Sequence, residues 1–379
     1  MKRFWCVPLF AAVLFLGLAL AGVALAGEGI WTPVSLDGIL STNNQSAACM
    51  LVYGGQLYVG TGGASSGANV YRFNGTAWSQ VGQTDLGDST NSRVACLAAH
   101  QGYLYAGTYN SAGGRLYKLA GSTWTLVDSL GMIQPEVASL ASDGTCLYYG
   151  SGGGTPGTAI VRKYCSGPAD DTPAGLNPNA TGFKAMVADG AVVYAGTANS
   201  SGPQVFRRSG GSWTDLSFSG SGFELGISAL VMSGGQLYAG TQVSSPGKAA
   251  LVWGYNNPGW SPLGPAGIDG SYPEAASLAA GSLYVGAGAG GSAVFMEEGG
   301  GWRMLNDNGF WDGNNFVASS MAVFNGDLYV GTSNSATGCE IWRHTWNLKV
   351  TLPPGSTVQD YKCISVPTNV GGQPLTQIL

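Results

Sequence analysis

The sequence predicts an all-β protein, a seven-bladed β-propeller with four antiparallel strands in each blade. The first observation is a repeated strand-like segment of the type LYVGT, whose tyrosine recurs at intervals of 43 to 47 residues. A period of this length in segments rich in strand-forming residues is the signature of propeller blades. The second is composition: 45% of the residues are hydrophobic, only 10% are charged and 62 are glycine, which suits stacked sheets joined by short turns. The repeated tyrosines are Tyr58, Tyr105, Tyr148, Tyr194, Tyr238, Tyr284 and Tyr329.

Each repeat divides into four predicted strands. The first carries small apolar residues, the second is the LYVGT strand, and the fourth opens with a tryptophan. The second and third strands lack a clean alternation of apolar and polar residues, which indicates burial of both faces between neighbouring blades. In the second repeat the four strands are ACLAAH at 95–100, YLYAGT at 103–108, RLYKL at 115–119 and TWTLV at 123–127.

A tryptophan before the first repeat predicts how the ring closes. Trp31 lies in GIWTPVSL, whereas the seventh repeat ends at GCEIWRHTW without a fourth strand of its own. The third repeat also lacks the tryptophan and has CSGPADDTPAGL instead. We therefore expect the N-terminal strand to complete the last blade of a ring over residues 29–346, which would protect the edges of that blade. The other fourth strands open with Trp78, Trp124, Trp213, Trp260 and Trp302.

The N-terminal residues 1–26 have the pattern of a cleaved signal peptide. Lys2 and Arg3 precede a long apolar run that ends in Ala24-Leu25-Ala26, so cleavage is expected before Gly27. This predicts a secreted protein, extracellular or periplasmic, with no membrane attachment after cleavage. The alternative is an uncleaved membrane anchor, because the apolar run is long enough to span a bilayer.

The propeller domain is expected to span residues 27–346 and to be followed by a different kind of segment. Residues 347–379 begin like a linker and then contain the strand-like stretch YKCISV. We interpret them as a linker and the start of a truncated C-terminal β module, or alternatively as a short packed extension. The protein is therefore expected to be a monomer or one part of a larger multidomain chain.

Cysteine spacing predicts one disulfide. Cys146 and Cys165 lie in one repeat, on strands expected to form a hairpin, and export permits disulfides. Cys49 and Cys96 share one repeat position, where other repeats have Ala or Ser, and are interpreted as small buried thiols. Cys339 and Cys363 could also pair, since spacing alone does not fix connectivity.

The turns before the tryptophans resemble a known propeller motif. In YRFNGTAW, YKLAGSTW and FRRSGGSW, the glycine and tryptophan match the Asp-box of sialidase-type propellers, Ser/Thr-x-Asp-x-Gly-x-Thr-Trp, while the aspartate is replaced by Phe73, Leu119 and Arg208. The resemblance, like that to kelch and WD-type propellers, implies the fold and no activity. A sialidase-like site would need clustered arginines, whereas here nearly every arginine is expected at the same position of a third strand, which suits a structural role: Arg72, Arg115, Arg162, Arg207 and Arg343.

Acidic residues gather in the segments that run from each tryptophan to the next first strand. These six segments, 31–46, 78–93, 124–137, 213–226, 260–274 and 302–316, hold eleven acids and two bases, a net charge of −9. Such connections emerge on one face of a propeller, so one face is expected to be acidic. It is either a binding surface for a ligand, cation or partner or simply a solvated surface. The candidate binding residues are Asp85, Asp88, Asp128, Glu136, Asp269, Asp307 and Asp312.

No metal site or cofactor is predicted. The only histidines are His100 and His344, in different repeats and without neighbouring acids, and no Cys-x-x-Cys occurs, so neither a zinc site nor a catalytic triad is expected. The loop NDNGFWDGNN at 306–315 carries oxygen ligands suited to calcium but lacks the spacing and the closing glutamate of the helix–loop–helix calcium motif. Calcium binding is at most weak by this reading.

Two functions remain open after these exclusions. The net charge of −5 and the absence of a basic cluster argue against a nucleic-acid partner. We expect an exported, non-enzymatic binding or scaffold module, such as part of a bacterial surface protein, with a glycan or protein partner on the acidic face and no catalytic residues. The alternative is a glycan-active hydrolase or lyase with its site at the channel mouth, which a pair of facing carboxylates would favour.

Overall fold

Short antiparallel strands make up most of the described chain. The computed structural model describes residues 28–63, 67–243, 248–264, 267–268, 272–288 and 291–347. The chain divides into two units, Trp31–Arg343 and a second one formed by Met1–Ile30 with His344–Leu379. The described residues contain no α-helix, only two 3-10 turns, η1 (Thr84–Gly87) and η2 (Asn308–Trp311). The predicted signal peptide, and the predicted tail beyond Asn347, lie outside the described residues.

Consecutive strands pair in groups of four, and each group begins with a strand of small apolar residues. The first two groups are β2 (Ser46–Tyr53), β3 (Gln56–Gly62), β4 (Val70–Phe73), β5 (Trp78–Gln80), and β6 (Asn91–His100), β7 (Tyr103–Asn110), β8 (Arg115–Ala120), β9 (Thr123–Ser129). The next two are β10 (Glu136–Ser142), β11 (Leu147–Gly152), β12 (Val161–Tyr164), β13 (Pro168–Asp170), and β14 (Gly182–Asp189), β15 (Val192–Ala198), β16 (Val205–Ser209), β17 (Ser212–Asp215).

The remaining groups follow the same order, and the last one takes a strand from the start of the chain. They are β18 (Glu224–Ser233), β19 (Gln236–Val243), β20 (Val252–Asn256), β21 (Gly259–Pro262), and β22 (Glu274–Ala279), β23 (Tyr284–Gly288), β24 (Ala293–Glu298), β25 (Gly301–Met304). In the last, β26 (Val317–Phe324) and β27 (Asp327–Ser333) are followed by β28 (Ile341–Asn347), which pairs with β1 (Glu28–Ser35).

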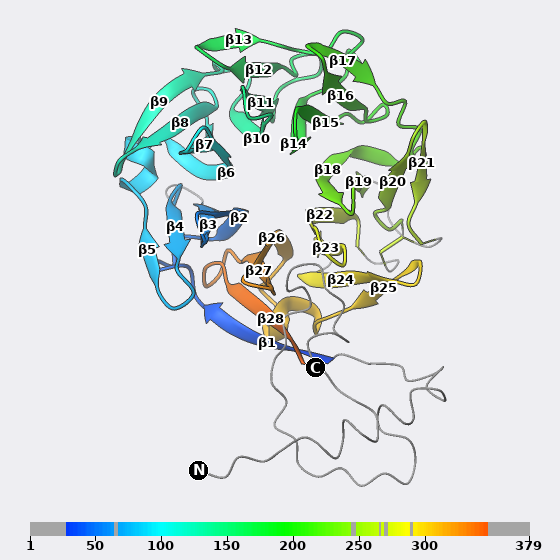
Figure 1. Cartoon of the computed structure of the whole chain (residues 1–379). Helices are drawn as coiled ribbons and strands as arrows, with labels where there is room; N and C mark the ends of the chain where they lie inside the picture. Colours follow the sequence, from blue (N-terminus) through cyan, green and yellow to red (C-terminus); the bar gives the residue numbers. More distant parts are fainter. Residues whose placement is uncertain are drawn as a thin grey trace, which may run out of the picture. The chain divides into compact units, whose positions relative to one another are not determined.

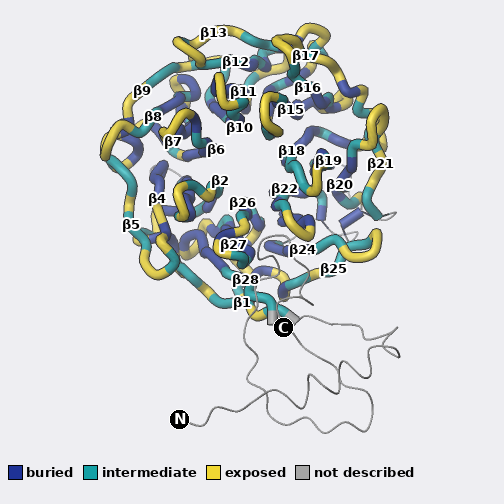
Figure 2. Tube along the Cα trace, viewed as in Figure 1, coloured by how far each residue is buried: buried dark blue, intermediate teal, exposed yellow. Residues whose placement is uncertain are grey.

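The groups within Trp31–Arg343 are arranged around a common centre (Figure 1), which is a β-propeller-like fold. Their first strands face the centre and their fourth strands lie on the outside. Burial is most continuous in the second strands, whereas the turns are exposed (Figure 2). Apolar side chains fill the space between groups: Leu57 and Phe73 of the first group pack with Phe324 and Tyr329 of the last.

Side chains of the first strands other than β14 tie their group to the next. Every pairing of a first and second strand is irregular at the same place, as between Ala47 and Cys49. A thiol or hydroxyl at this bulge then donates to a backbone carbonyl of the following group. These bonds are Cys49 to Val94 (3.5 Å), Cys96 to Val137 (3.1 Å), Ser139 to Phe183 (2.6 Å), Ser228 to Ala275 (2.7 Å), Ser277 to Ala318 (2.8 Å) and Ser320 to Ala47 (2.5 Å).

The same close approach explains the glycine of the LYVGT strand. A Cβ placed on Gly60 would lie 2.6 Å from Cys49 Sγ and 2.7 Å from Val94 Cγ1, closer than real contacts allow. Burial of the Cys49 thiol raises its pKa to about 12, so it stays protonated and unreactive. The two cysteines of this position are therefore small packing and hydrogen-bonding residues, as their place in the repeat predicted.

The tryptophans of the fourth strands form a second set of bonds between groups. Each indole Nε1 donates to the preceding group, usually to the carbonyl three residues beyond that group's own tryptophan. The bonds are Trp78 to Val34, Trp124 to Val81, Trp260 to Leu216, Trp302 to Leu263 and Trp31 to Leu305. Trp213 donates instead to Asp171 Oδ2 at 2.9 Å, in the group whose PADD segment lacks a tryptophan. Trp31 thus occupies the tryptophan position of the last group.

Two further sequence expectations are settled here. Cys146 and Cys165 form the expected disulfide, with Cα atoms 4.4 Å apart. The arginines of the third strands do not share one position, which corrects the sequence interpretation. Their partners across the ladder are Tyr58 for Arg72, Tyr194 for Arg207, Tyr149 for Arg162 and Thr108 for Arg115. The last two are therefore displaced from the repeated tyrosines, toward the loops that follow the second strand.

Candidate functional site

Three of the predicted binding acids form ion pairs with arginines of the chain itself. The displaced arginines described above supply two of these partners. The pairs are Asp88 with Arg115, Asp128 with Arg162 (2.5 Å) and Glu136 with Arg93 (2.5 Å). Their charge is thus largely compensated within the fold, which differs from the expectation of a uniformly acidic face.

Two other predicted acids hold loops together. Asp85 is buried, and its Oδ1 accepts a hydrogen bond from the Gly67 amide at 3.1 Å. Asp312 Oδ1 accepts from the Asn314 amide and its Oδ2 from Asn334 Nδ2, both at 2.9 Å. Asp307 is exposed, and Asp269 lies outside the described residues. A binding role for these acids stays a prediction.

Buried asparagines organise these loops, and the sequence reading missed them. Asn91 is fully buried and accepts from Thr108 Oγ1 at 3.0 Å, while its Nδ2 donates to Asp85 O at 3.0 Å and to Tyr117 OH at 3.0 Å. Asn44 and Asn315 make the same type of contact with the threonine of their second strands, Thr61 and Thr332. A signal was present, because Asn44, Asn91 and Asn315 each stand fourteen residues before a repeated tyrosine.

A cavity of about 210 Å³ lies between the first strands. It is lined by residues of β2, β6, β10, β14, β18, β22 and β26, and most of them are Ala, Ser, Leu, Met or Cys. Lys184 is the one charged side chain among the described residues that line it. At the corresponding bulge positions of the other first strands the residue is Ala or Ser, so the lysine breaks the repeat.

Glu274, at the start of β22, is the acid most affected by this lysine. Burial raises the pKa of the Glu274 carboxyl, and the charge of Lys184 opposes that shift. A carboxyl that holds its proton more tightly than usual is suited to donating one. Glu274 itself is not one of the described residues that line the central cavity.

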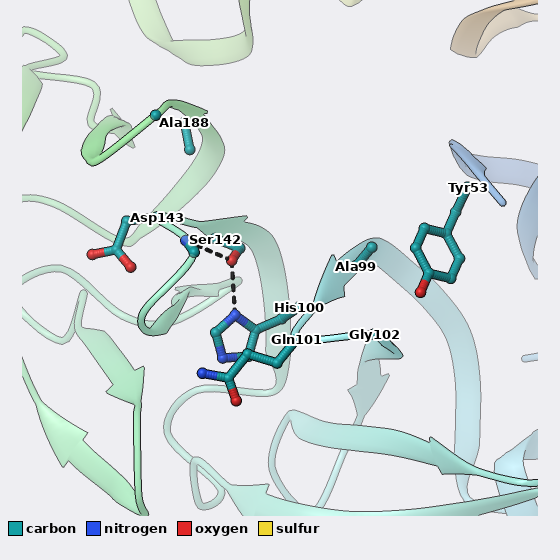
Figure 3. Close-up of a pocket in the computed structure, with 10 residues that line it drawn as sticks. Tyr53, Ala99, His100, Gln101, Gly102, Ser142, Asp143 and Ala188 are labelled. Carbon is teal, nitrogen blue, oxygen red and sulfur yellow. Dashed lines mark hydrogen bonds between the residues drawn. The ribbon is translucent and has the colours of Figure 1, made fainter.

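A second and larger pocket, of about 470 Å³, lies at the turns between first and second strands. We call it the turn-side pocket; its lining includes Tyr53, His100, Gln101, Ser142 and Asp143. His100 Nδ1 is 2.8 Å from Ser142 Oγ, and Figure 3 shows the Asp143 carboxylate directed away from the imidazole. The His100 ring is buried, which lowers its pKa, with the charges of Asp143 and Lys118 acting in opposite directions.

The geometry of the turn-side pocket suits binding better than nucleophilic catalysis. A serine–histidine pair needs a third group that orients the imidazole. His100 Nε2 has no hydrogen-bond partner, and the Asp143 oxygens accept instead from the amides of Thr145 and Cys146 and from Tyr148 OH. The turn-side pocket is therefore an open pocket lined by polar groups that could form hydrogen bonds with a ligand.

The described residues hold no group of three or more His, Cys, Asp or Glu side chains that could bind a metal ion. In the same part of the chain, no helix has the length and apolar character needed to cross a membrane. Weak calcium binding by the 306–315 loop is not tested by these observations.

Comparison with known proteins shows likeness in fold alone. No protein-family model matches the chain, and no curated protein matches it in sequence. The extracellular domain of a one-component system from B. thetaiotaomicron gives a TM-score of 0.57 at 15% identity, over 82% of this chain and 39% of that chain. A chain of a mitotic checkpoint complex gives 0.58 at 16% identity, over 86% of this chain and 99% of that one. Together with the all-β structure, these matches support a β-propeller-like fold.

Proposed function

We propose that the chain is an exported, non-enzymatic binding or scaffold module, built as a seven-bladed β-propeller closed by β1. Seven groups of four strands, and a cavity lined by seven first strands, support the blade number. The bonds of Trp31 to Leu305 and of Ser320 to Ala47 support closure between the last group and its neighbours. Export rests on the signal-peptide pattern of residues 1–26.

The observation that carries the binding role is how the described charged and nucleophilic groups are used. Catalysis needs a few groups held in one unique geometry, whereas here acids are engaged by arginines or by loop amides in several groups. The Ser142–His100 pair has no orienting acid. The fold likeness includes an extracellular domain and a chain of a protein complex, roles that suit a recognition module. A glycan or protein partner fits this proposal, and a cofactor is not required by it.

A glycan-active hydrolase or lyase is the second candidate, and Glu274 is the observation that favours it. A glycosidase needs one carboxylic acid with a raised pKa together with a second carboxylate. Glu274 meets the first requirement. Two other acids begin first strands: Glu136 is occupied by Arg93, and Glu224 accepts from the amides of Ser221 and Gly222, which is why this function ranks second.

The test is to measure retention and turnover side by side on the secreted protein. Immobilised polysaccharides and basic and acidic proteins would be screened for binding, while reducing ends and unsaturated sugars are followed in solution. Binding without product supports the proposal, and it is contradicted if nothing in the panel is retained. Product formation that is lost in Glu274→Gln but kept in Glu297→Gln, a control that is half-buried like Glu274, would establish the enzyme instead.

A further inference from the structure

Two loops of the chain have the same backbone conformation and can therefore be compared residue by residue. They contain η1 and η2 and end at Asn91 and Asn315. The amides of these asparagines donate to Asp88 O and Asp312 O, each at 3.0 Å. Their side chains donate to Asp85 O at 3.0 Å and to Gly309 O at 2.9 Å. Position by position, Gly87 therefore corresponds to Trp311 and Asp88 to Asp312.

The first difference between the loops is the residue at the exposed left-handed position. Gly87 has φ 83° and Trp311 has φ 65°. This conformation is free for glycine but strains the backbone of a bulky residue. Trp311 does not recover this by burial, because 67% of it is exposed, whereas the adjacent Phe310 is 1% exposed. Leu40, in the loop that ends at Asn44, is equally exposed at φ 60°, so strain and exposure do not set Trp311 apart; its aromatic ring does.

Trp311 is also held in place. Its ring lies 5.6 Å from that of Trp342, and Trp342 stacks on the buried Phe310 with ring centroids 5.2 Å apart and planes 12° apart. Phe310 in turn meets Trp31 edge-on at 4.8 Å. An exposed indole supported by a buried aromatic stack is presented to solvent in a fixed orientation, which lowers the entropy lost on binding.

The second difference is a reversal of charge beside the tryptophan. In the η1 loop, Asp88 pairs with Arg115, which follows the loop after the second strand and contacts Thr108 through its carbonyl at 3.4 Å. In the η2 loop the corresponding threonine, Thr332, exchanges hydrogen bonds of 3.0 Å with the backbone of Glu340. Glu340 thus stands where Arg115 stands.

Asp312 consequently faces a second acid where Asp88 faces a base. The Glu340 carboxyl is buried and accepts from Asn315 Nδ2 at 2.6 Å and Trp342 Nε1 at 2.8 Å. Burial raises its pKa, and the charges of Asp312 and Asp37 raise it further. Among the described residues, no cation pairs with Asp312; its oxygens accept from the neutral amides of Asn314 and Asn334 instead, which leaves its charge uncompensated.

We propose that Trp311 and Asp312 form a site for a cationic side chain of a protein partner, an arginine in particular, beside the buried Glu340. The site rests on the binding role proposed above and specifies the chemistry of the partner. A guanidinium can stack flat on the exposed indole face and donate to the Asp312 carboxylate at its edge, which an ammonium cannot do in the same plane. The partner's guanidinium would supply to the η2 loop the positive charge that Arg115 of the chain itself supplies to the η1 loop.

The experiment is calorimetric titration of the whole chain with an acetylated, amidated Gly-Arg-Gly-Arg-Gly peptide and its citrulline counterpart. We expect the arginine peptide to bind and the citrulline peptide not to bind. The affinity for the arginine peptide should fall as NaCl rises from 50 to 500 mM, because the contacts are exposed. Trp311→Gly should weaken binding about tenfold or more and leave the fold intact, because Gly87 occupies the same conformation. Asp312→Asn should weaken it about threefold.

Two control variants distinguish binding at this site from a nonspecific effect of the protein's net negative charge. Asp189→Asn makes the same change in net charge at the turn between β14 and β15, and Met132→Ala removes an exposed apolar side chain, 77% exposed, from another loop. Both should bind within twofold of the native protein. Equal affinity for the citrulline peptide, unchanged binding in Trp311→Gly, or no binding of the native protein up to about 1 mM peptide would each overturn the site. If another ligand of the wider panel is retained at the same time, the proposed binding function survives that failure.

Discussion

Replacing Trp31 tests whether β1 links the last group of strands to both of its neighbours. Its Nε1 donates to Leu305 O at 2.7 Å, in the group before, and its ring lies 4.8 Å from Phe310. Three residues later, Val34 O accepts from Trp78 Nε1 of the first group at 3.2 Å. If the ring closes through β1, these contacts should contribute as much to the free energy of unfolding as the equivalent contacts between any other two neighbouring groups.

The expected losses can be ranked from these contacts. Trp31→Phe keeps a ring but removes the donor, which should cost about 1 kcal/mol and leave Leu305 O without that partner. Trp31→Ala also removes a half-buried ring, for a total of about 3 kcal/mol, the low end for aromatic-to-alanine changes. Deleting residues 27–36 removes the β1 ladder and the acceptor of Trp78 as well, so we expect more than about 4 kcal/mol.

Thermal and urea unfolding measure these losses directly. In a domain of this size each kcal/mol shifts Tm by about 2 °C, so the deletion should lower Tm by about 8 °C or more. Trp302→Phe, which removes the equivalent bond to Leu263 O, is the matched control and should resemble Trp31→Phe. The reasoning about closure fails if the deletion and Trp31→Ala leave the unfolding midpoint unchanged while Trp302→Phe lowers it.

Three other outcomes are expected. Replacing Cys146 and Cys165 by serine should lower the free energy of unfolding by about 3 kcal/mol, since the bridge closes a loop with a sequence separation of 19, and an equal urea midpoint would contradict this. Asn91→Ala should cost about 2–3 kcal/mol by removing the acceptor of Thr108 Oγ1 and Asn110 Nδ2 and the donor to Tyr117 OH, which denaturation can measure against the exposed Asn314→Ala. Because the pKa of Cys49 is raised to about 12, its thiol stays protonated at pH 8.5, and mass spectrometry should find it unalkylated in the native state and labelled only after unfolding.

The repeated segments are similar enough in sequence to be aligned with one another. This alignment is sufficient to predict the strands, the disulfide and the place of Trp31. LYVGT could be found because its leucine and tyrosine are buried and its glycine is required by close contact between groups, so each repeat keeps it. The position of the arginines could not be found in the same way. The loops between second and third strands vary in length, so distance along the chain does not give the register, and Arg115 lies three residues from the place expected of it.

The loop interactions were beyond sequence reasoning for a different reason. Asparagine is common in exposed turns, so the three asparagines fourteen residues before a tyrosine look like ordinary loop residues. Only the structure reveals that Asn91 is buried and holds the loop backbone. The acidic-face hypothesis failed to anticipate ion pairing for the same reason, since Asp88 and its partner Arg115 are 27 residues apart and meet through strand pairing.

Departures from the repeat carry most of the functional information in such a chain. A residue that recurs in each group is accounted for by the bonds it makes to the next group, as Cys49 and Ser139 are. When a large or charged residue replaces a small or neutral one at an equivalent position, such bonds between groups do not explain its presence. Trp311 in place of a glycine carries backbone strain while exposed, and Lys184 in place of alanine or serine puts a charge into the central cavity. Neither residue is required by the packing, so these two positions are where the binding role proposed above can be tested with least risk to the fold.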